Sequence, residues 1–133
     1  MEIAHRADEA GISVPPPYRR NIRVLLAPDR QSVSELTFTL VEIPAGSGTD
    51  EHTHDRLELI YIVEGRAIIS CNGQPSSVSQ DDVILVRSGE LHRVANGGDD
   101  TLRMATVFVP GYPAAENYER CLTSAVATAG GAV

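Results

Sequence analysis

The sequence predicts an all-β fold, an antiparallel sandwich or barrel, with one short helical segment near the C-terminal end. Much of the chain is divided into short β-branched stretches, several of which alternate apolar with polar residues. Pairs of Gly, Pro, Asn or Asp separate these stretches, and no helical pattern lies between them. The chain has 133 residues, of which 42% are hydrophobic, so it fits a single domain with its own core.

The expected elements follow in order. Residues 1–17 should form an extended N-terminal arm, because they are polar and end in Val-Pro-Pro-Pro, which favours a polyproline path. Residues 18–113 should form the β domain, in which Asn72-Gly73 is a strong hairpin signal because both residues tolerate positive φ. Residues 114–133 should form a helix with a frayed tail over the last six residues, since Pro113 suits a first helical turn. The expected strands are 21–28, 34–44, 57–65, 66–71, 76–79, 82–89, 92–98 and 101–111.

Charge and hydropathy exclude several classes of function. The chain carries 18 acidic and 11 basic residues, so no basic patch is available to neutralise nucleic acid or an anionic membrane. The first 11 residues are charged throughout and do not resemble a signal peptide, and no apolar run approaches the roughly 20 residues of a membrane span. We therefore expect a cytoplasmic protein with no nucleic-acid or membrane partner. In that setting Cys71 and Cys121 should be free thiols.

Three potential metal ligands lie close together before an apolar strand. His52 and His54 point the same way if their segment is extended, and Glu58 shares their parity. His92 opens a later strand after a Gly turn and is a fourth candidate. Imidazoles with a carboxylate suit Fe, Mn, Ni, Co or Zn. The alternative is that His52 and His54 are solvated loop histidines and Glu58 is a surface acid. A His-Thr-His pattern taken alone is more often a pair of such loop histidines than a metal site.

The spacing of these residues resembles the two-motif signature of the cupin superfamily. The first motif matches at every defining position, which are Gly46, His52, His54, Glu58 and Gly65. The second motif keeps Gly89, His92 and Asn96. It departs at Asp81, where the family usually has Gly, and at Arg87, where it usually has Pro. Asp tolerates a left-handed turn, so the first departure is mild.

The resemblance implies a cupin jelly-roll β-barrel that holds one divalent transition metal, which is Fe, Mn, Ni, Co or Zn. The implied ligands are His52, His54, Glu58 and His92. Four protein ligands leave two neighbouring positions of a six-coordinate ion open, as in catalytic rather than structural sites.

Three functions remain open for such a site. The first is a non-haem Fe(II) dioxygenase acting on a compact organic substrate. The second is a Lewis-acid isomerase, lyase or cyclase that uses Zn, Mn or Ni. The third is a non-catalytic, metal-containing module that binds a small molecule. No catalytic residue beyond the ligands is predicted. The expected pocket residues are Phe38, Leu40, Ile60, Met104 and Thr106.

The strand after Glu58 is apolar on both faces. Ile60 should point inward, whereas Leu59, Tyr61 and Val63 should point outward. A strand of this kind is covered on both faces, either by the N-terminal arm or by a second subunit. Cupins are commonly dimers, so we expect a homodimer. The C-terminal segment, with Tyr118, is a candidate to close one mouth of the barrel.

Overall fold

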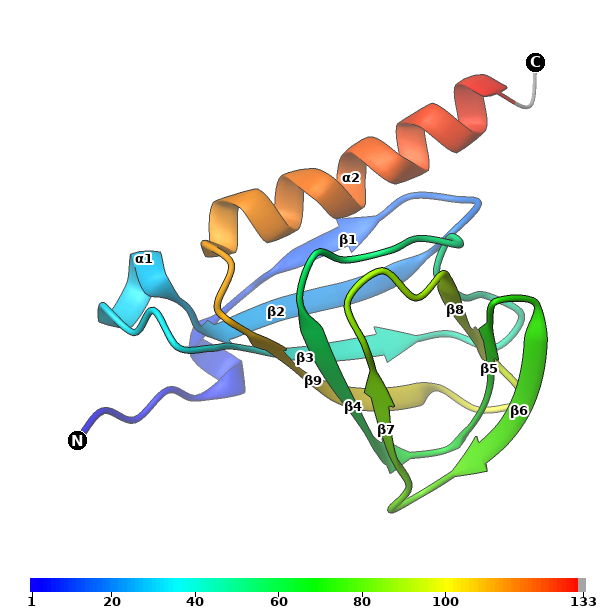
Figure 1. Ribbon diagram of the computed structural model, residues 1–133, viewed down its shortest axis with the longest axis horizontal. Coiled ribbons are helices and arrows are strands. Elements are labelled where there is room, and N and C mark those ends of the chain that lie inside the picture. The colour runs from blue at the N-terminus through cyan, green and yellow to red at the C-terminus, as the bar shows by residue number, and fades with distance from the viewer. Residues whose placement is uncertain (132–133) are drawn as a thin grey trace.

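The chain folds into two antiparallel sheets that enclose the core (Figure 1). The structure is a computed structural model that describes the backbone of residues 1–131 and the side chains of residues 1–124. The larger sheet has the strand order β1-β2-β3-β9-β4-β7, and the smaller has the order β6-β5-β8. The expected all-β jelly roll with a C-terminal helix is confirmed.

The elements have the following bounds. The strands are β1 (Ile12–Val14), β2 (Arg20–Leu26), β3 (Thr37–Ile43), β4 (Leu57–Glu64), β5 (Arg66–Cys71), β6 (Gln74–Ser79), β7 (Val83–Val86), β8 (His92–Asn96) and β9 (Leu102–Val109). The helical elements are the 3-10 turn η1 (Arg6–Asp8), α1 (Pro28–Gln31) and α2 (Ala114–Gly131).

The core lies between the two sheets and divides into an apolar and a polar part. Ile43, Ile62 and Leu102 are fully buried, and burial of each such side chain stabilises the fold by roughly 1.5–3 kcal/mol. The buried polar side chains include His54, Glu58, His92, Thr39 and Thr106. Buried polar groups are costly unless they have partners, so this part of the interior is the place to look for a site.

Two turns bear out the expectations for their residues. Asn72 and Gly73 have φ of 49° and 82°, and they join β5 to β6 in a hairpin that pairs Cys71 with Gln74. Asp81 has a φ of 73°, so it takes the left-handed conformation in place of the usual Gly. Its backbone N–H donates to the carbonyl of Ile62 at 2.9 Å, which fixes the turn against β4.

The N-terminal segment is part of the larger sheet rather than only an arm. β1 pairs with β2, with Ile12 opposite Ile22 and Val14 opposite Arg20. Val14 is buried in the core. The prolines that follow it hid this strand from sequence reasoning, because they leave only three residues with strand character.

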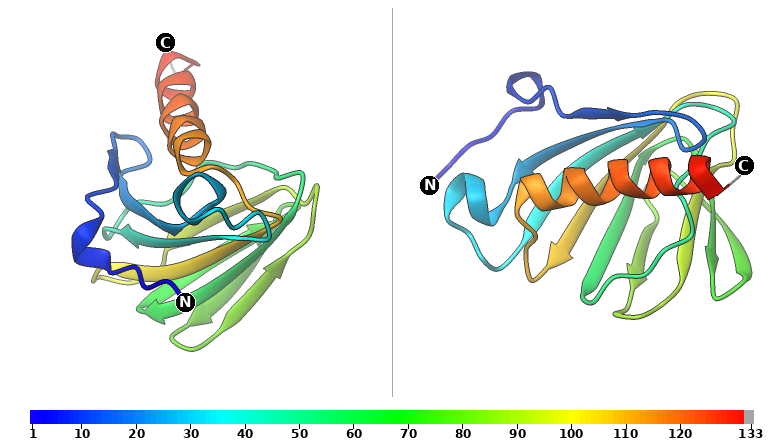
Figure 2. Two further views of the ribbon diagram at one scale, coloured as in Figure 1. Left: turned by 90° about the vertical axis from the view of Figure 1, so that its left-hand side faces the viewer. Right: turned by 90° about the horizontal axis from the view of Figure 1, so that it is seen from above.

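Helix α2 packs beside β1, β2 and α1 (Figures 1 and 2). Its first N–H group, from Ala114, donates to Asp29 Oδ1 at 2.7 Å, so a side chain of α1 caps α2. The Tyr118 hydroxyl accepts from the backbone N–H of Val24 at 2.7 Å and lies 3.1 Å from Glu9 Oε1. The helix runs to Gly131, and the last two residues of the expected frayed tail lie outside the described residues. Among the described residues, no helix is both long and apolar enough to cross a membrane.

Candidate metal centre

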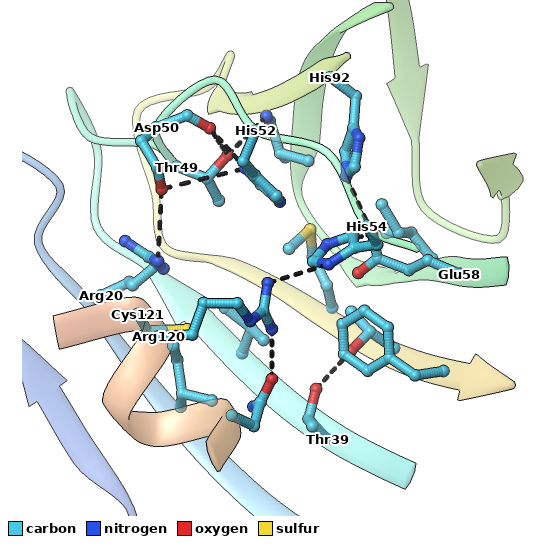
Figure 3. Close-up of a pocket in the computed structure, with 18 of the residues that line it drawn as sticks. Arg20, Thr39, Thr49, Asp50, His52, His54, Glu58, His92, Arg120 and Cys121 are labelled. Atoms are coloured by element: carbon cyan, nitrogen blue, oxygen red, sulfur yellow. Dashed lines mark hydrogen bonds and ion pairs between the residues drawn. The ribbon is translucent and has the colours of Figure 1, made fainter. Parts of the chain in front are cut away.

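Four side chains from three parts of the chain converge inside the fold (Figure 3). His52 and His54 lie in the connection between β3 and β4, Glu58 lies in β4, and His92 opens β8. One ligand atom from each lies within 4.8 Å of the others. His52 lies outside the strands but forms a single β-bridge with His92, in which the two residues exchange backbone hydrogen bonds of 3.0 and 2.9 Å. This bridge ties the first motif to the second.

Backbone carbonyls orient two of the imidazoles. His52 Nδ1 lies 2.8 Å from the carbonyl oxygen of Asp50, and His92 Nδ1 lies 2.8 Å from that of Glu90. In a neutral ring Nδ1–H therefore donates to the carbonyl, which leaves the Nε2 lone pair free. Metal-binding histidines are usually oriented in this way.

The centre contains a carboxylate and a nitrogen that a cation would satisfy. Glu58 is buried, and its Oε1 lies 3.0 Å from His92 Nε2. His54 Nε2 lies 3.5 Å from the same oxygen but makes no hydrogen bond to any described residue, although it is buried. Ligand atoms about 2.0–2.2 Å from an ion lie up to about 4.4 Å apart, so small shifts would close the site around a metal. The four residues fit a borderline divalent ion.

The surroundings set the protonation of the imidazoles. Burial, and then the charge of Arg120, lower the pKa of His54 to about 2. Burial also lowers the pKa of His52. Burial acts to lower the pKa of His92, but the hydrogen bonds to Glu58 and to the Glu90 carbonyl outweigh it and raise the pKa above 6.5. His52 and His54 are therefore neutral near pH 7, whereas a proton competes for His92.

A cavity of about 200 Å³ opens onto the four residues. Of the five residues named from the sequence for a substrate pocket, Ile60, Met104 and Thr106 lie in its wall. Phe38 and Leu40 do not line it. In β3 the inward residues include Thr39 and Val41, and Thr39 pairs with Thr106 across the sheet through a hydrogen bond between the hydroxyls. The first half of β3 thus turns threonines inward and Phe38 and Leu40 outward, whereas its second half keeps apolar residues inside.

Sequence reasoning considered the C-terminal segment for closing the barrel mouth, but it did not identify the side chains of α2 that line the cavity. Asn117, Arg120, Cys121 and Ser124 line it, so the helix forms one of its walls. Their spacing of three and four residues places them on one helical face, and this was the available signal. Tyr118, the residue considered for closing the barrel mouth, instead anchors the helix to β2.

Two arginines reach the cavity from different sides (Figure 3). Arg120 Nη1 lies 3.0 Å from His54 Nδ1, and its Nη2 donates to Asn117 Oδ1. The Arg120 guanidinium lies 5.1 Å from the centre of the Tyr112 ring. The side chain of Arg20 is 5% exposed, and its Nη2 lies 3.9 Å from Asp50 Oδ1.

Comparison with known proteins places this geometry in a family. The model of the cupin domain matches residues 39–109, which is more than half of the chain. The chain is 27% identical over 117 residues to the tetracenomycin polyketide synthase protein TcmJ of Streptomyces glaucescens, covering 86% of this chain and 78% of that protein. It is 30% identical over 73 residues to an oxalate-binding protein of Thermotoga maritima, covering 54% of this chain and 60% of that protein.

Solved structures share the fold at low sequence identity. A predicted oxalate decarboxylase from Thermotoga maritima superposes with a TM-score of 0.75 at 21% identity, covering 82% of this chain and 99% of that chain. KdgF from Halomonas sp. superposes with a TM-score of 0.70 at 18% identity, covering 84% of this chain and 96% of that chain. The match to the cupin domain confirms the resemblance drawn from the two motifs. The chain belongs to the cupin family.

Proposed function

We propose that the chain is a metal-dependent enzyme that acts on a small dicarbonyl compound. The observation that carries the proposal is the convergence of three imidazoles and a buried carboxylate within 4.8 Å at the wall of a cavity of about 200 Å³. His52, His54, Glu58 and His92 would hold the metal. A divalent ion held there would supply a Lewis acid for a carbonyl oxygen or, as iron, a centre for oxygen chemistry.

Lewis-acid chemistry on a polyketide intermediate, such as a cyclisation or isomerisation, is the first candidate. Two relatives support the polyketide part of this proposal, since both are named as polyketide synthase proteins. They are TcmJ and CurC of Streptomyces cyaneus, the latter 28% identical over 85 residues. Polyketide intermediates carry 1,3-dicarbonyl groups, whose paired oxygens suit a hard or borderline ion. The cavity accommodates the reacting end of such a chain rather than its full length.

The residues of the wall would position that reacting end. Ile60, Met104 and Phe108 form an apolar surface that excludes water from the carbonyl groups. The hydroxyls of Thr39 and Thr106 lie on the same wall and are hydrogen-bonded to each other, so either could turn to donate to a substrate oxygen. Burial and the charge of Arg120 keep His54 neutral near pH 7. To bind the ion through Nε2, the His54 ring would carry its proton on Nδ1, so the contact between Nδ1 and Arg120 Nη1 would open when the metal binds.

An Fe(II) dioxygenase is the second candidate, because three imidazoles and a carboxylate also suit Fe(II). The apolar wall of Ile60, Met104 and Phe108 would exclude water from either reaction, so it does not separate the first two candidates. A non-catalytic binding module is the third, supported by the oxalate-binding relative from Thermotoga maritima.

One experiment separates the three candidates. Chelator-treated protein would be reloaded with Fe(II), Zn(II) or Mn(II), and a panel of diketones, phenols and hydroxy acids would be assayed for oxygen uptake and for product. Turnover without oxygen that is retained with Zn(II) or Mn(II) supports the Lewis-acid enzyme. Substrate-dependent oxygen uptake with Fe(II) alone would replace it with the dioxygenase. Tight binding without turnover under any metal would leave the binding module.

We also propose that the chain is a homodimer built on the outer face of the larger sheet. Tyr61 lies opposite Val83 and Leu59 lies opposite Leu85 across β4 and β7. Tyr61, Val83 and Leu85 are 41%, 63% and 45% exposed, so they form an apolar surface that a second copy would cover. The N-terminal strand β1 lies at the opposite edge of the sheet from β7, which disfavours the arm as the cover.

A further inference from the structure

The guanidinium of Arg120 reaches the cavity without an anionic partner. Its Nη1 lies 3.0 Å from His54 Nδ1 and its Nη2 donates to the amide oxygen of Asn117, so neither partner is a carboxylate. Its Nε is buried and has no hydrogen-bond partner among the described residues. No carboxylate among the described side chains forms an ion pair with it. A half-buried cation of this kind, with no anion beside it, lacks an interaction that an anionic ligand would supply.

The charges of the cavity wall indicate the charge of the ligand that would bind there. The arginine and carboxylate residues of the lining are Arg20, Arg120, Asp50 and Glu58. Two guanidiniums balance two carboxylates, so a bound divalent ion would leave the cavity with an excess of about two positive charges. An uncharged ligand would not offset this excess, whereas an anionic one would.

The donors of Arg120 also restrict the shape of the ligand. A guanidinium has five N–H donors in one plane, and only two contacts to protein acceptors account for them here. The geometry that best satisfies such a group is a planar anion with two oxygens, which can accept two parallel hydrogen bonds. The faces of Phe108 and Tyr112, 5.6 and 5.1 Å from the guanidinium carbon, restrict where that plane can lie.

From these contacts we infer that Arg120 is a substrate-binding residue for a small planar anion with two oxygens, either a carboxylate or the enolate of a 1,3-dicarbonyl compound. This inference rests on the proposed function, because the metal would be the second group that binds the anion. It assigns charge selectivity to α2, a segment outside residues 39–109 that match the cupin domain. The competing role is a purely structural one, in which Arg120 holds α2 against His54 and Asn117.

The test is calorimetric titration of metal-loaded protein with oxalate, with acetylacetone at a pH where its enolate is populated, and with oxamide, a neutral isostere of oxalate. In Arg120→Gln the affinity for the anion should fall roughly 10- to 100-fold, the range for loss of a charged hydrogen bond, while the affinity for oxamide stays unchanged. Arg93→Gln is the matched control, because it removes an exposed arginine beside His92 and should change neither affinity. Binding of oxalate alone identifies a carboxylate, and binding of acetylacetone alone identifies an enolate.

Two readouts keep the inference separate from the proposed function. Metal content, measured by elemental analysis, should be equal in wild type and Arg120→Gln. Loss of anion binding in Arg120→Gln at full metal content supports the inference whether or not any turnover is found. Equal losses for oxalate and oxamide, or no loss for either anion, would overturn it in favour of the structural role. If Arg120→Gln fails to fold, Arg120→Lys keeps the charge without the planar fork, and its ratio of oxalate to oxamide affinity should still fall below that of wild type.

Discussion

Replacing Glu58 by Gln should have opposite consequences with and without metal. In the metal-free protein, Glu58 is buried and its Oε1 lies 3.0 Å from His92 Nε2. A Gln amide has the same size and can either accept a hydrogen bond from a protonated Nε2 or donate one to an unprotonated Nε2. We therefore expect the free energy of unfolding of metal-free Glu58→Gln to stay within about 1 kcal/mol of metal-free wild type.

With metal the substitution should remove most of the stabilisation that the ion provides. An ion at 100 times its Kd stabilises the folded protein by about 2.7 kcal/mol. Glu58 is the one carboxylate among the four candidate ligands, so its loss should weaken binding at least about 100-fold. At the same metal concentration the remaining stabilisation is then about 0.4 kcal/mol. For a chain of this size, 1 kcal/mol corresponds to roughly 3–5 °C in Tm. The rise in Tm on adding metal should therefore be roughly 8–13 °C in wild type and about 2 °C in Glu58→Gln.

Scanning calorimetry of chelator-treated protein, with and without added Zn(II) or Mn(II), measures both effects. Glu64→Gln is the matched control, because Glu64 lies on the same strand with a side chain 63% exposed and should keep the full shift. A wild-type metal shift in Glu58→Gln would refute the assignment of Glu58 as a ligand. A large loss of stability in the metal-free variant would show that the carboxylate serves the fold instead.

Three further predictions concern pH, assembly and the cysteines. Metal occupancy, measured by elemental analysis, should fall as the pH drops through the raised pKa of His92, because protons and metal compete for Nε2. In the metal-free protein the sign is reversed: the raised pKa stabilises the fold below the ordinary value of 6.5, and this contribution is lost as the pH rises through the folded pKa. Sedimentation of wild type should report a dimer, and Tyr61→Glu should report a monomer; a wild-type monomer at micromolar concentration would contradict the proposed interface. Thiol titration of denatured, unreduced protein should find both Cys71 and Cys121 free, as they are in the structure, whereas finding no thiols would mean a disulfide.

Short-range spacing made the candidate ligands predictable. His52, His54 and Glu58 lie within seven residues of one another, so the local path of the chain largely determines which way they point. His92 lies 34 residues after Glu58, and only the second motif of the family linked it to the first three. The Asn72-Gly73 hairpin was predictable for the same local reason, since positive φ at both positions is a property of those residue types.

Long-range packing decided what could not be predicted. The orientation of β3 is set by its pairing with β9, which turns Thr39 inward and Phe38 outward against the usual preference for apolar interiors. The place of α2 depends on contacts made across most of the chain, from Ala114 to Asp29 and from Tyr118 to Val24. No local pattern contains these contacts, so the helix was predicted but its side chains in the cavity were not.

The position of α2 means that one wall of the cavity and the candidate ligands come from two different stretches, which can diverge separately. The four candidate ligands lie within residues 39–109, whereas Asn117, Arg120 and Cys121 lie beyond that range on a helix with its own cap and anchor. Substitutions on the inner face of α2 can alter which molecules enter without disturbing the residues that hold the ion. Relatives with the same four ligands and a different C-terminal helix should therefore differ in substrate, and exchange of residues 113–131 between them should transfer ligand preference while metal content stays the same.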